Sequence, residues 1–202
     1  MLSVEADNPA VASIGGRLVL AGGLDVEVFD PAMETWTAGA PPLNEEYEVA
    51  SAALNGTLFV AGGYGPASGW TPVNTVNAYG AGTDSWSTLA SMPTARWCAT
   101  GAAANGKFYV IGGFDSSSTG LSTVEEYDPA TNSWATRSPM PTARGLSAAA
   151  TAGGKIYVIG GYPDYGVNDA YDTVEVYDPV LDSWATAPAL PVPKGGLSAA
   201  GV

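Results

Sequence analysis

The stretch "NGKFYVIGG" at residues 105–113 joins an Asn-Gly step, a run of strand-forming residues and a closing glycine pair. Asn-Gly before alternating apolar residues predicts a hairpin, because a tight turn between strands needs residues that accept positive φ. The pair Gly112-Gly113 needs another explanation, since glycine weakens a strand. A near copy, "GGKIYVIGG", stands at 153–161. This recurrence indicates an internal repeat.

Four such units follow one another along the chain. In each unit a glycine pair ends an apolar strand, and an aromatic residue and then a tryptophan come later. The glycine pairs are Gly22-Gly23, Gly62-Gly63, Gly112-Gly113 and Gly160-Gly161. The aromatic residues are Phe29, Tyr79, Tyr127 and Tyr177, and the tryptophans are Trp36, Trp86, Trp134 and Trp184, about 50 residues apart. The stretch between glycine pair and aromatic residue varies in length, so it is predicted to be a loop.

The order and spacing of these features resemble the kelch repeat, and the resemblance covers essentially the whole chain. It implies an all-β fold, a kelch-type β-propeller of four-stranded antiparallel blades. The chain is expected to be a single domain, residues 1–202, whose repeats span approximately residues 7–44, 45–94, 95–142 and 143–192. Residues 193–202 are expected to add an extra inner strand.

Each repeat contains four short strand candidates, which we label A to D in chain order. In the third repeat they are residues 97–104, 107–112, 123–128 and 133–138. One four-stranded sheet cannot bury both of its faces alone, and stacking blades around an axis solves this problem. The A strands are rich in small residues, which fit the axis where neighbouring blades converge. We therefore expect strand A to lie innermost and strand D outermost.

The number of blades leaves two interpretations. Four repeats are few for a kelch propeller, and the chain has five A-type segments, because residues 7–14 and 193–202 both have this character. The favoured interpretation is an open or partial propeller, either a window of a longer one or an array that pairs with another copy. The alternative is a closed four-bladed ring with a spare strand. An open array exposes an apolar blade face, which predicts self-association through the open blade edges.

Composition restricts the class of partner. The chain has 20 acidic and 7 basic residues, for a net charge of −13. Nucleic acids and anionic membranes attract clustered Lys and Arg, so neither is an expected partner. We find no bilayer-spanning apolar run and no signal-peptide pattern at the N-terminus. Low lysine content and low pI are compatible with an extracellular bacterial origin, but the single Cys98 leaves the compartment undetermined.

The antiparallel order A-B-C-D places the AB and CD turns on one rim, and the BC loops and DA connections on the other. The AB and CD turns are short. The BC loops of the second to fourth repeats are long and irregular, at residues 64–74, 114–122 and 162–172. Long loops on a rigid scaffold usually carry function. We therefore expect the binding surface at the BC/DA rim.

Three cations lie in the DA connections, ten residues after a repeat tryptophan: Arg96, Arg144 and Lys194. In peptide-binding kelch adaptors, arginines at this motif position contact acidic peptides. The resemblance therefore implies a ligand role for Arg96 and Arg144, while Lys194 matches in charge only. The first repeat departs, because Glu46 takes this position. The alternative is that these arginines hydrogen-bond neighbouring blades.

Aromatic residues fall into two groups. The repeat tryptophans and tyrosines are expected to pack in the core. Trp70, Tyr162 and Tyr165 lie outside the repeat pattern, in BC loops. Exposed aromatic residues are frequent binding hot spots, so these three are candidate contacts for a peptide or a sugar. A role in anchoring their own loops is the alternative.

The absence of histidine weakens most catalytic alternatives. Galactose oxidase and nitrile-specifier proteins resemble kelch proteins, but their metal sites use histidine. In N-acetylneuraminate epimerase the sugar-acid site could rest on arginine and carboxylates, so here Arg96 and Arg144 would bind the carboxylate and Glu46 would act as base. No metal site or cofactor is expected, and the acidic loop at 162–172 matches no calcium motif.

The sequence thus favours a non-catalytic scaffold that binds a protein or peptide at its BC/DA rim. The alternative is a carbohydrate-binding or sugar-acid epimerase-like kelch protein.

Overall fold

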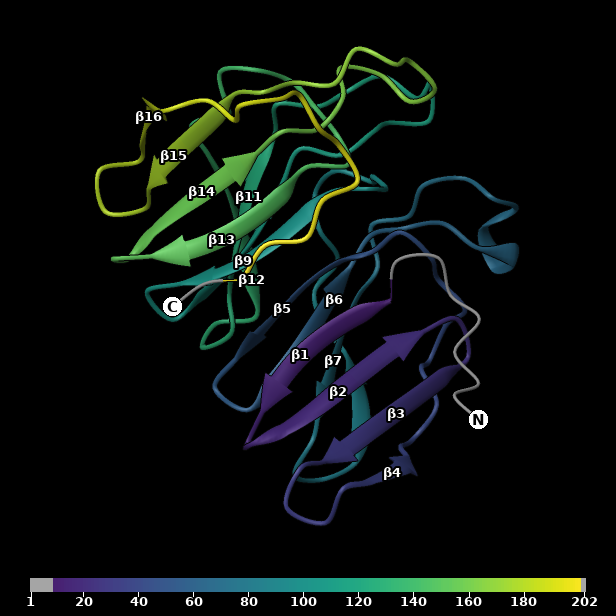
Figure 1. Cartoon of the computed structure of the whole chain (residues 1–202). Coiled ribbons are helices and arrows are strands. Elements are labelled where there is room, and N and C mark those ends of the chain that lie inside the picture. The colour runs from purple at the N-terminus through teal and green to yellow at the C-terminus, as the bar shows by residue number, and fades with distance from the viewer. Residues whose placement is uncertain (1–8, 201–202) are drawn as a thin grey trace.

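The computed structural model describes residues 9–200, which form four separate four-stranded antiparallel sheets (Figure 1). Blade 1 holds β1 (Ala10–Ile14), β2 (Arg17–Gly22), β3 (Asp25–Asp30) and β4 (Thr35–Ala38). Blade 2 holds β5 (Ala50–Leu54), β6 (Thr57–Ala61), β7 (Val76–Gly80) and β8 (Ser85–Thr88). Blade 3 holds β9 (Thr100–Ala104), β10 (Lys107–Ile111), β11 (Val124–Asp128) and β12 (Ser133–Arg137). Blade 4 holds β13 (Ala148–Ala152), β14 (Lys155–Ile159), β15 (Val174–Asp178) and β16 (Ser183–Ala187).

Strand order within each sheet follows the chain, so each repeat makes one blade. This confirms the predicted all-β fold of four-stranded antiparallel blades. The helical structure of residues 9–200 is one short 3₁₀ turn, η1 (Pro66–Ser68). No helix in that range is long and apolar enough to cross a membrane.

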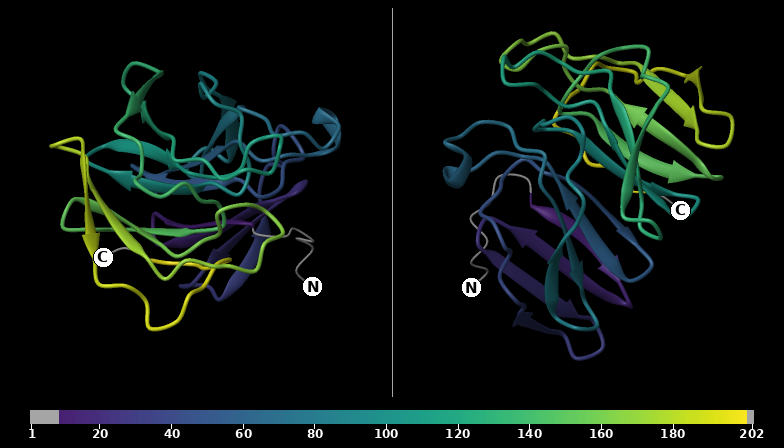
Figure 2. Two further views of the ribbon diagram at one scale, coloured as in Figure 1. Left: turned by 90° about the horizontal axis from the view of Figure 1, so that it is seen from above. Right: turned by 180° about the vertical axis from the view of Figure 1, so that it is seen from behind.

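The first strand of each blade is the innermost. β1, β5, β9 and β13 follow one another around a common axis, and β4, β8, β12 and β16 lie outside (Figures 1 and 2). The inner strands approach each other closely. A Cβ at Gly101 in β9 would overlap the main chain of Ser51 in β5, so only glycine fits there. Small side chains permit this spacing. The predicted radial order is therefore confirmed.

The hydrophobic core lies between the blades. Successive residues of a strand point to opposite faces of its sheet, and in β6 this directs Leu58 toward blade 1 and Phe59 toward blade 3. Phe59 lies 5.6 Å from the ring of Phe108 and 5.8 Å from that of Tyr127. Full burial of one such side chain contributes about 1.5–3 kcal/mol. Each inner blade is therefore stabilised by both of its neighbours.

A hydrogen-bond chain, which we name the interblade clamp, recurs at each junction. In blade 3 the Tyr127 hydroxyl donates to Asn132 Oδ1 at 2.8 Å, and the same oxygen accepts the Ala90 amide of blade 2 at 2.8 Å. Trp134 Nε1 donates to the Ala90 carbonyl at 2.8 Å. The equivalent sets are Tyr79, Asp84 and Trp86 on Ala40, and Tyr177, Asp182 and Trp184 on Ser138. The repeat tyrosines are buried and the tryptophans of blades 2 to 4 are partly buried in this clamp, as predicted. The prediction is wrong for Trp36, which is 42% exposed because blade 1 has no preceding blade in the described structure.

The glycine pair that ends strand B lies where three segments meet. Gly112 has φ +64° and Gly113 has φ +96°. A Cβ at Gly112 would overlap the carbonyl oxygen of Arg144 in the next connection, and a Cβ at Gly113 would lie 2.8 Å from the Trp97 carbonyl oxygen. The Gly113 amide donates to the Arg144 carbonyl at 2.9 Å. The pair therefore serves close approach between blades rather than chemistry.

The four blades form an open arc: the inner strands β1 and β5, β5 and β9, and β9 and β13 contact each other, whereas β13 and β1 make no comparable contact. The extra inner strand expected at 193–202 does not form over its described part, residues 193–200. The physical reason is that an A strand pairs with the B strand of its own blade, and the described residues contain no B strand after residue 193. Residues 201–202, and 7–8 of the first expected A segment, lie outside the described residues.

Two alanine substitutions separate the two reasons for glycine in this repeat, positive φ and close packing. Gly106, in the A–B turn, needs only the first, whereas Gly112, at the end of strand B, needs both. Gly106→Ala should lower the free energy of unfolding by about 1–2 kcal/mol, because φ is +75° but the space beside it is open. Gly112→Ala should cost about 2–5 kcal/mol, because overpacking against Arg144 adds to the same backbone penalty. Urea denaturation measures both. Equal losses would contradict the close-approach explanation.

Candidate functional site

The BC loops and DA connections share the rim that lies opposite the short AB turns, as the antiparallel order predicts (Figure 1). The loops of blades 3 and 4 are bonded to each other along this rim. The Gly120 amide donates to the Pro163 carbonyl at 2.9 Å, and the Tyr165 amide donates to the Ser118 carbonyl at 3.0 Å. These main-chain bonds join two loops into one surface, which positions Tyr165 toward blade 3.

The BC loop of blade 2 holds Trp70 through its own turn, η1. The Trp70 amide donates to the Gly65 carbonyl at 2.9 Å, and the Thr71 hydroxyl donates to the Ser68 carbonyl at 2.7 Å. Trp70 has φ +63° and its side chain is 59% exposed. Its ring stacks near Tyr47 at 6.0 Å. The loop therefore presents a large aromatic face to solvent from a fixed backbone.

These loops enclose a small cleft of about 220 Å³, which we name the rim cleft. Its walls are the rings of Tyr64, Trp70, Trp97 and Tyr165, with Pro72 beside them. Trp97 is central, because its ring lies 5.1 Å from Tyr64 and 4.5 Å from Tyr165.

The edge of the rim cleft is polar, and its shape is fixed by the blade 3 loop. Trp97 Nε1 donates to the Asp115 carbonyl at 3.3 Å. Asp115 Oδ1 accepts the amides of Ser117 at 2.8 Å and Thr119 at 3.0 Å. Asp115, Ser116 and Ser118 line the cleft on this side. The cleft thus combines an aromatic floor with carboxylate and hydroxyl groups at its edge.

The structure places Arg96 and Arg144 away from this surface. Both side chains are 0% exposed. Arg96 donates to the carbonyls of Gly112 and Thr123 and forms an ion pair with Glu125. Arg144 donates to the Gly160 carbonyl at 2.8 Å and pairs with Glu175 at 2.7 Å.

The alternative that these arginines bond neighbouring blades is thus the arrangement observed. Burial lowers the pKa of both arginines, and the glutamate partners oppose that change. In this conformation a ligand on the rim has no access to either guanidinium.

The remaining predicted site residues lie in different surroundings. Trp70 and Tyr165 meet at the rim cleft, but Tyr162 is half-buried and its ring covers Gly195. Lys194 is exposed, and its main chain follows the path of the buried arginines, with its amide 3.1 Å from the Tyr171 carbonyl.

Tyr64 and Trp97 were not among the predicted site residues. A signal for Tyr64 was present, since an aromatic residue follows the glycine pair in three repeats, at Tyr64, Phe114 and Tyr162.

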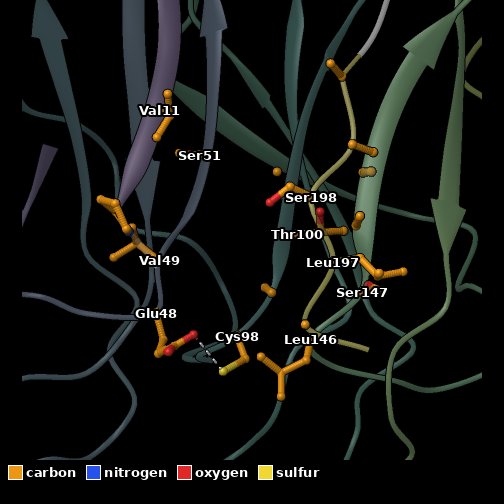
Figure 3. A pocket seen from close by; sticks show the side chains of 18 residues that line it. Val11, Glu48, Val49, Ser51, Cys98, Thr100, Leu146, Ser147, Leu197 and Ser198 are labelled. Atoms are coloured by element: carbon orange, nitrogen blue, oxygen red, sulfur yellow. Dashed lines mark hydrogen bonds between the residues drawn. The ribbon is translucent and has the colours of Figure 1, made fainter. Parts of the chain in front are cut away.

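A second cavity of about 410 Å³, the axial pocket, lies among the inner strands (Figure 3). Its mouth carries Glu48, Cys98 and Leu146 at equivalent positions, each with positive φ. The Cys98 amide donates to the Glu48 carbonyl at 2.9 Å, and the Leu146 amide donates to the Cys98 carbonyl at 3.0 Å. Burial, together with the Glu48 carboxylate 3.2 Å away, raises the pKa of the Cys98 thiol. The thiol therefore stays protonated and is a poor nucleophile.

The junction of blades 1 and 2 departs from the Arg–Glu pattern. Glu46 takes the arginine position and accepts a hydrogen bond from the Thr75 hydroxyl. Asn77 takes the position of Glu125 and Glu175 and is buried. Burial raises the pKa of Glu46. Among residues 9–200 no group of three His, Cys, Asp or Glu side chains is placed to hold a metal ion.

Comparison with known proteins gives a consistent family. A model of the KLHDC2/KLHL20/DRC7 kelch-repeats domain matches residues 5–200. The F-box/kelch-repeat protein At1g67480 of Arabidopsis thaliana is 31% identical over 109 residues, covering 54% of this chain and 28% of that protein. Kelch-like protein 35 of Mus musculus is 32% identical over 115 residues, covering 52% of this chain and 19% of that protein. The matches thus span less than a third of the length of these curated relatives.

A similarity in structure extends further along the chain. The solved structure of YjhT matches with a TM-score of 0.82 and 22% sequence identity, covering 96% of this chain and 68% of that one. At this identity the similarity shows the fold alone.

A double-mutant cycle tests the structural role of the buried pair. Arg144→Met should lower the free energy of unfolding by about 3–5 kcal/mol, because it leaves the Glu175 carboxylate buried without its cation. Adding Glu175→Gln should recover part of that loss. The control Lys155→Ala breaks an exposed pair with Asp178 and should cost at most about 1 kcal/mol. Denaturant unfolding measures all of these, and a loss for Arg144→Met as small as the control would contradict the assignment.

Proposed function

This chain belongs to the KLHDC2/KLHL20/DRC7 kelch-repeats domain family, and we propose that it is a non-catalytic scaffold that binds a protein or peptide partner at its loop rim. The observation that carries this proposal is the rim cleft. Four aromatic rings converge there, and two of them are largely exposed, Trp70 at 59% and Tyr165 at 52%. Trp and Tyr dominate binding hot spots because they bury a large area at low entropic cost.

The chemistry of the rim indicates which kind of peptide it would bind. The cleft offers aromatic faces, and Asp115 lines its edge. A second carboxylate, Asp164, accepts the Gly120 amide at 3.3 Å on the adjoining loops. The net charge of the chain is −13. An aromatic face attracts a cation, and an acidic surface speeds the approach of a basic partner. We therefore propose a peptide that inserts a large apolar or arginine side chain and carries further basic residues. Burial of Arg96 and Arg144 removes the basis for an acidic peptide.

The sugar-acid alternative depends on residues that are already engaged. Arg96 and Arg144 would have to bind a substrate carboxylate, but their guanidinium groups pair with Glu125 and Glu175. This weakens the epimerase-like proposal. A neutral glycan stays a second candidate for the same rim cleft, because Trp70 and Tyr165 expose flat aromatic faces.

The binding test starts from a random peptide library displayed on phage and selected on the 202-residue chain. Selected peptides should be rich in aromatic and arginine residues. Trp70→Ala and Tyr165→Ala should each raise the Kd of a fluorescent peptide at least tenfold, because each removes a wall of the cleft. The matched control is Leu181→Ala, a 71% exposed apolar residue at the C–D turn of blade 4 on the opposite rim.

The outcomes separate the candidates. Affinity for the peptide should fall as salt rises, because its basic residues meet an acidic rim. Binding that survives both aromatic substitutions would overturn the proposed site. A glycan array with hits lost in Trp70→Ala, and no enriched peptides, would replace the peptide by a sugar.

A further inference from the structure

The first blade leaves an apolar face uncovered. Leu18, Phe29 and Trp36 form one cross-strand row in β2, β3 and β4. In blade 2 the same row is Leu58, Tyr79 and Trp86, and blade 1 covers it, so Leu58 is 0% exposed. Leu18 is 41% exposed and Trp36 is 42% exposed. Blade 1 thus carries, on this face, the kind of row with which blades 2, 3 and 4 each contact the blade before them.

The last blade leaves the opposite face uncovered. Tyr157 in β14 points away from blade 3 and is only half-buried. Its equivalent in blade 3, Tyr109, is 1% exposed because it packs 5.9 Å from the Tyr177 ring of the following blade. Ile159 and Val176 flank Tyr157 on this face and are half-buried as well. Blade 4 therefore retains the side chains that would receive a following blade.

The interblade clamp changes at both ends in ways that match. Blade 1 has Phe29 and Glu34 at the positions of the clamp tyrosine and its Asp or Asn acceptor. Blade 4 has Pro188 at the position of Ala40, Ala90 and Ser138, whose amides the acceptor binds. Proline has no amide hydrogen. In the inner clamps the acceptor oxygen receives two hydrogen bonds, from the tyrosine hydroxyl and from the amide. Blade 1 lacks the hydroxyl and blade 4 lacks the amide hydrogen, so both donors are missing from a junction between the two ends, and the exposed Glu34 carboxylate stays in water.

Charge at the two ends also matches. Glu27 occupies in β3 the position that Glu125 and Glu175 occupy in their blades. Lys194 occupies the position of Arg96 and Arg144 and is exposed. A junction of blade 4 with blade 1 would bring Lys194 and Glu27 together, in the place where the inner junctions hold an Arg–Glu pair.

From these four matches we propose that the uncovered face of blade 4 binds blade 1 of a second copy of this chain, head to tail. The interface would continue the blade-to-blade packing already present three times in the arc. Two copies joined in this way at both ends supply eight blades, which falls within the four to eight of closed propellers. A head-to-tail interface of this kind forms a ring if its rotation closes.

The C-terminal segment is compatible with this junction. Lys194 to Leu197 follow the path of an ordinary connection, since the Gly196 amide donates to the Leu146 carbonyl at 2.8 Å. Ser198, Ala199 and Ala200 then line the axial pocket (Figure 3). The segment therefore runs on the axial side and leaves the outer part of the blade 4 face open.

Light scattering and sedimentation equilibrium of the 202-residue chain give the first test. We expect a mass of twice 20.4 kDa at micromolar concentrations. Trp36→Arg, on the blade 1 face, and Tyr157→Lys, on the blade 4 face, should each shift the protein toward monomer, because either change weakens both junctions of the dimer. Val180→Lys, an 81% exposed apolar residue at the C–D turn of blade 4, is the matched control and should keep the dimer. Circular dichroism and the unfolding midpoint establish that each variant is folded.

Mixing identifies the geometry. In a mixture of a Leu18→Lys/Trp36→Arg chain with a Tyr157→Lys/Val176→Lys chain, one junction stays intact. This mixture should form heterodimers, while each variant alone is monomeric. Head-to-head pairing predicts the opposite, that one of the two variants alone still dimerises fully.

Charge exchange tests the junction chemistry. Lys194→Glu and Glu27→Lys should each raise the dimer dissociation constant about tenfold, and the double variant should recover most of the affinity. A monomeric wild-type chain, or a dimer that is indifferent to the substitutions on both blade faces, would overturn the proposal.

Discussion

The contact between adjacent blades is the interaction on which the rest of this structure depends. A four-stranded sheet of this size has two apolar faces and no helix to cover either of them. Alternation along β6 therefore sends Leu58 and Phe59 to different neighbours, and burial of both depends on the blades on each side. The aromatic residues of strand C and the tryptophans of strand D extend this contact outward and add hydrogen bonds to the adjacent connection. The stability of each blade therefore depends on its contacts with the adjacent blades.

The same constraint explains where functional residues are available. The connections between blades are occupied by the clamp bonds and by the buried pairs Arg96–Glu125 and Arg144–Glu175. These arginines and glutamates hold the connections against the next blade, and the buried guanidinium groups are not accessible to a ligand. The BC loops begin at the glycine pairs, where the chain leaves the sheet. They carry aromatic residues, such as Trp70 and Tyr165, that are exposed and not needed for contact between blades. We therefore propose that the binding surface is built from the loops, because the repeat residues already hold the blades together.

Much of the fold could be predicted from the sequence because the repeat carries it in invariant spacings. The turn at Asn105-Gly106, the strand that follows and the later Trp134 fix one blade, and the small residues of strand A fix its radial direction. The burial of Arg96 could not be decided from the sequence, because its partner Glu125 belongs to the next blade and either interpretation fits the motif. The rim cleft depends on irregular loops, so the meeting of Tyr64, Trp97 and Tyr165 followed from no spacing. Residues 193–200 resemble an inner strand in composition, but strand formation requires a partner B strand, and the described part of the chain holds none after residue 193.

Hydrogen exchange followed by mass spectrometry at several protein concentrations tests this account most directly. If each blade depends on a neighbour, the two ends of the arc should gain protection as the ends of two copies meet. The account predicts that amides of β2–β4 and β14–β16 exchange more slowly as protein concentration rises, while those of β6, β7, β10 and β11 do not change. Exchange at the two ends that is independent of concentration, and as slow as in the inner blades, would contradict it.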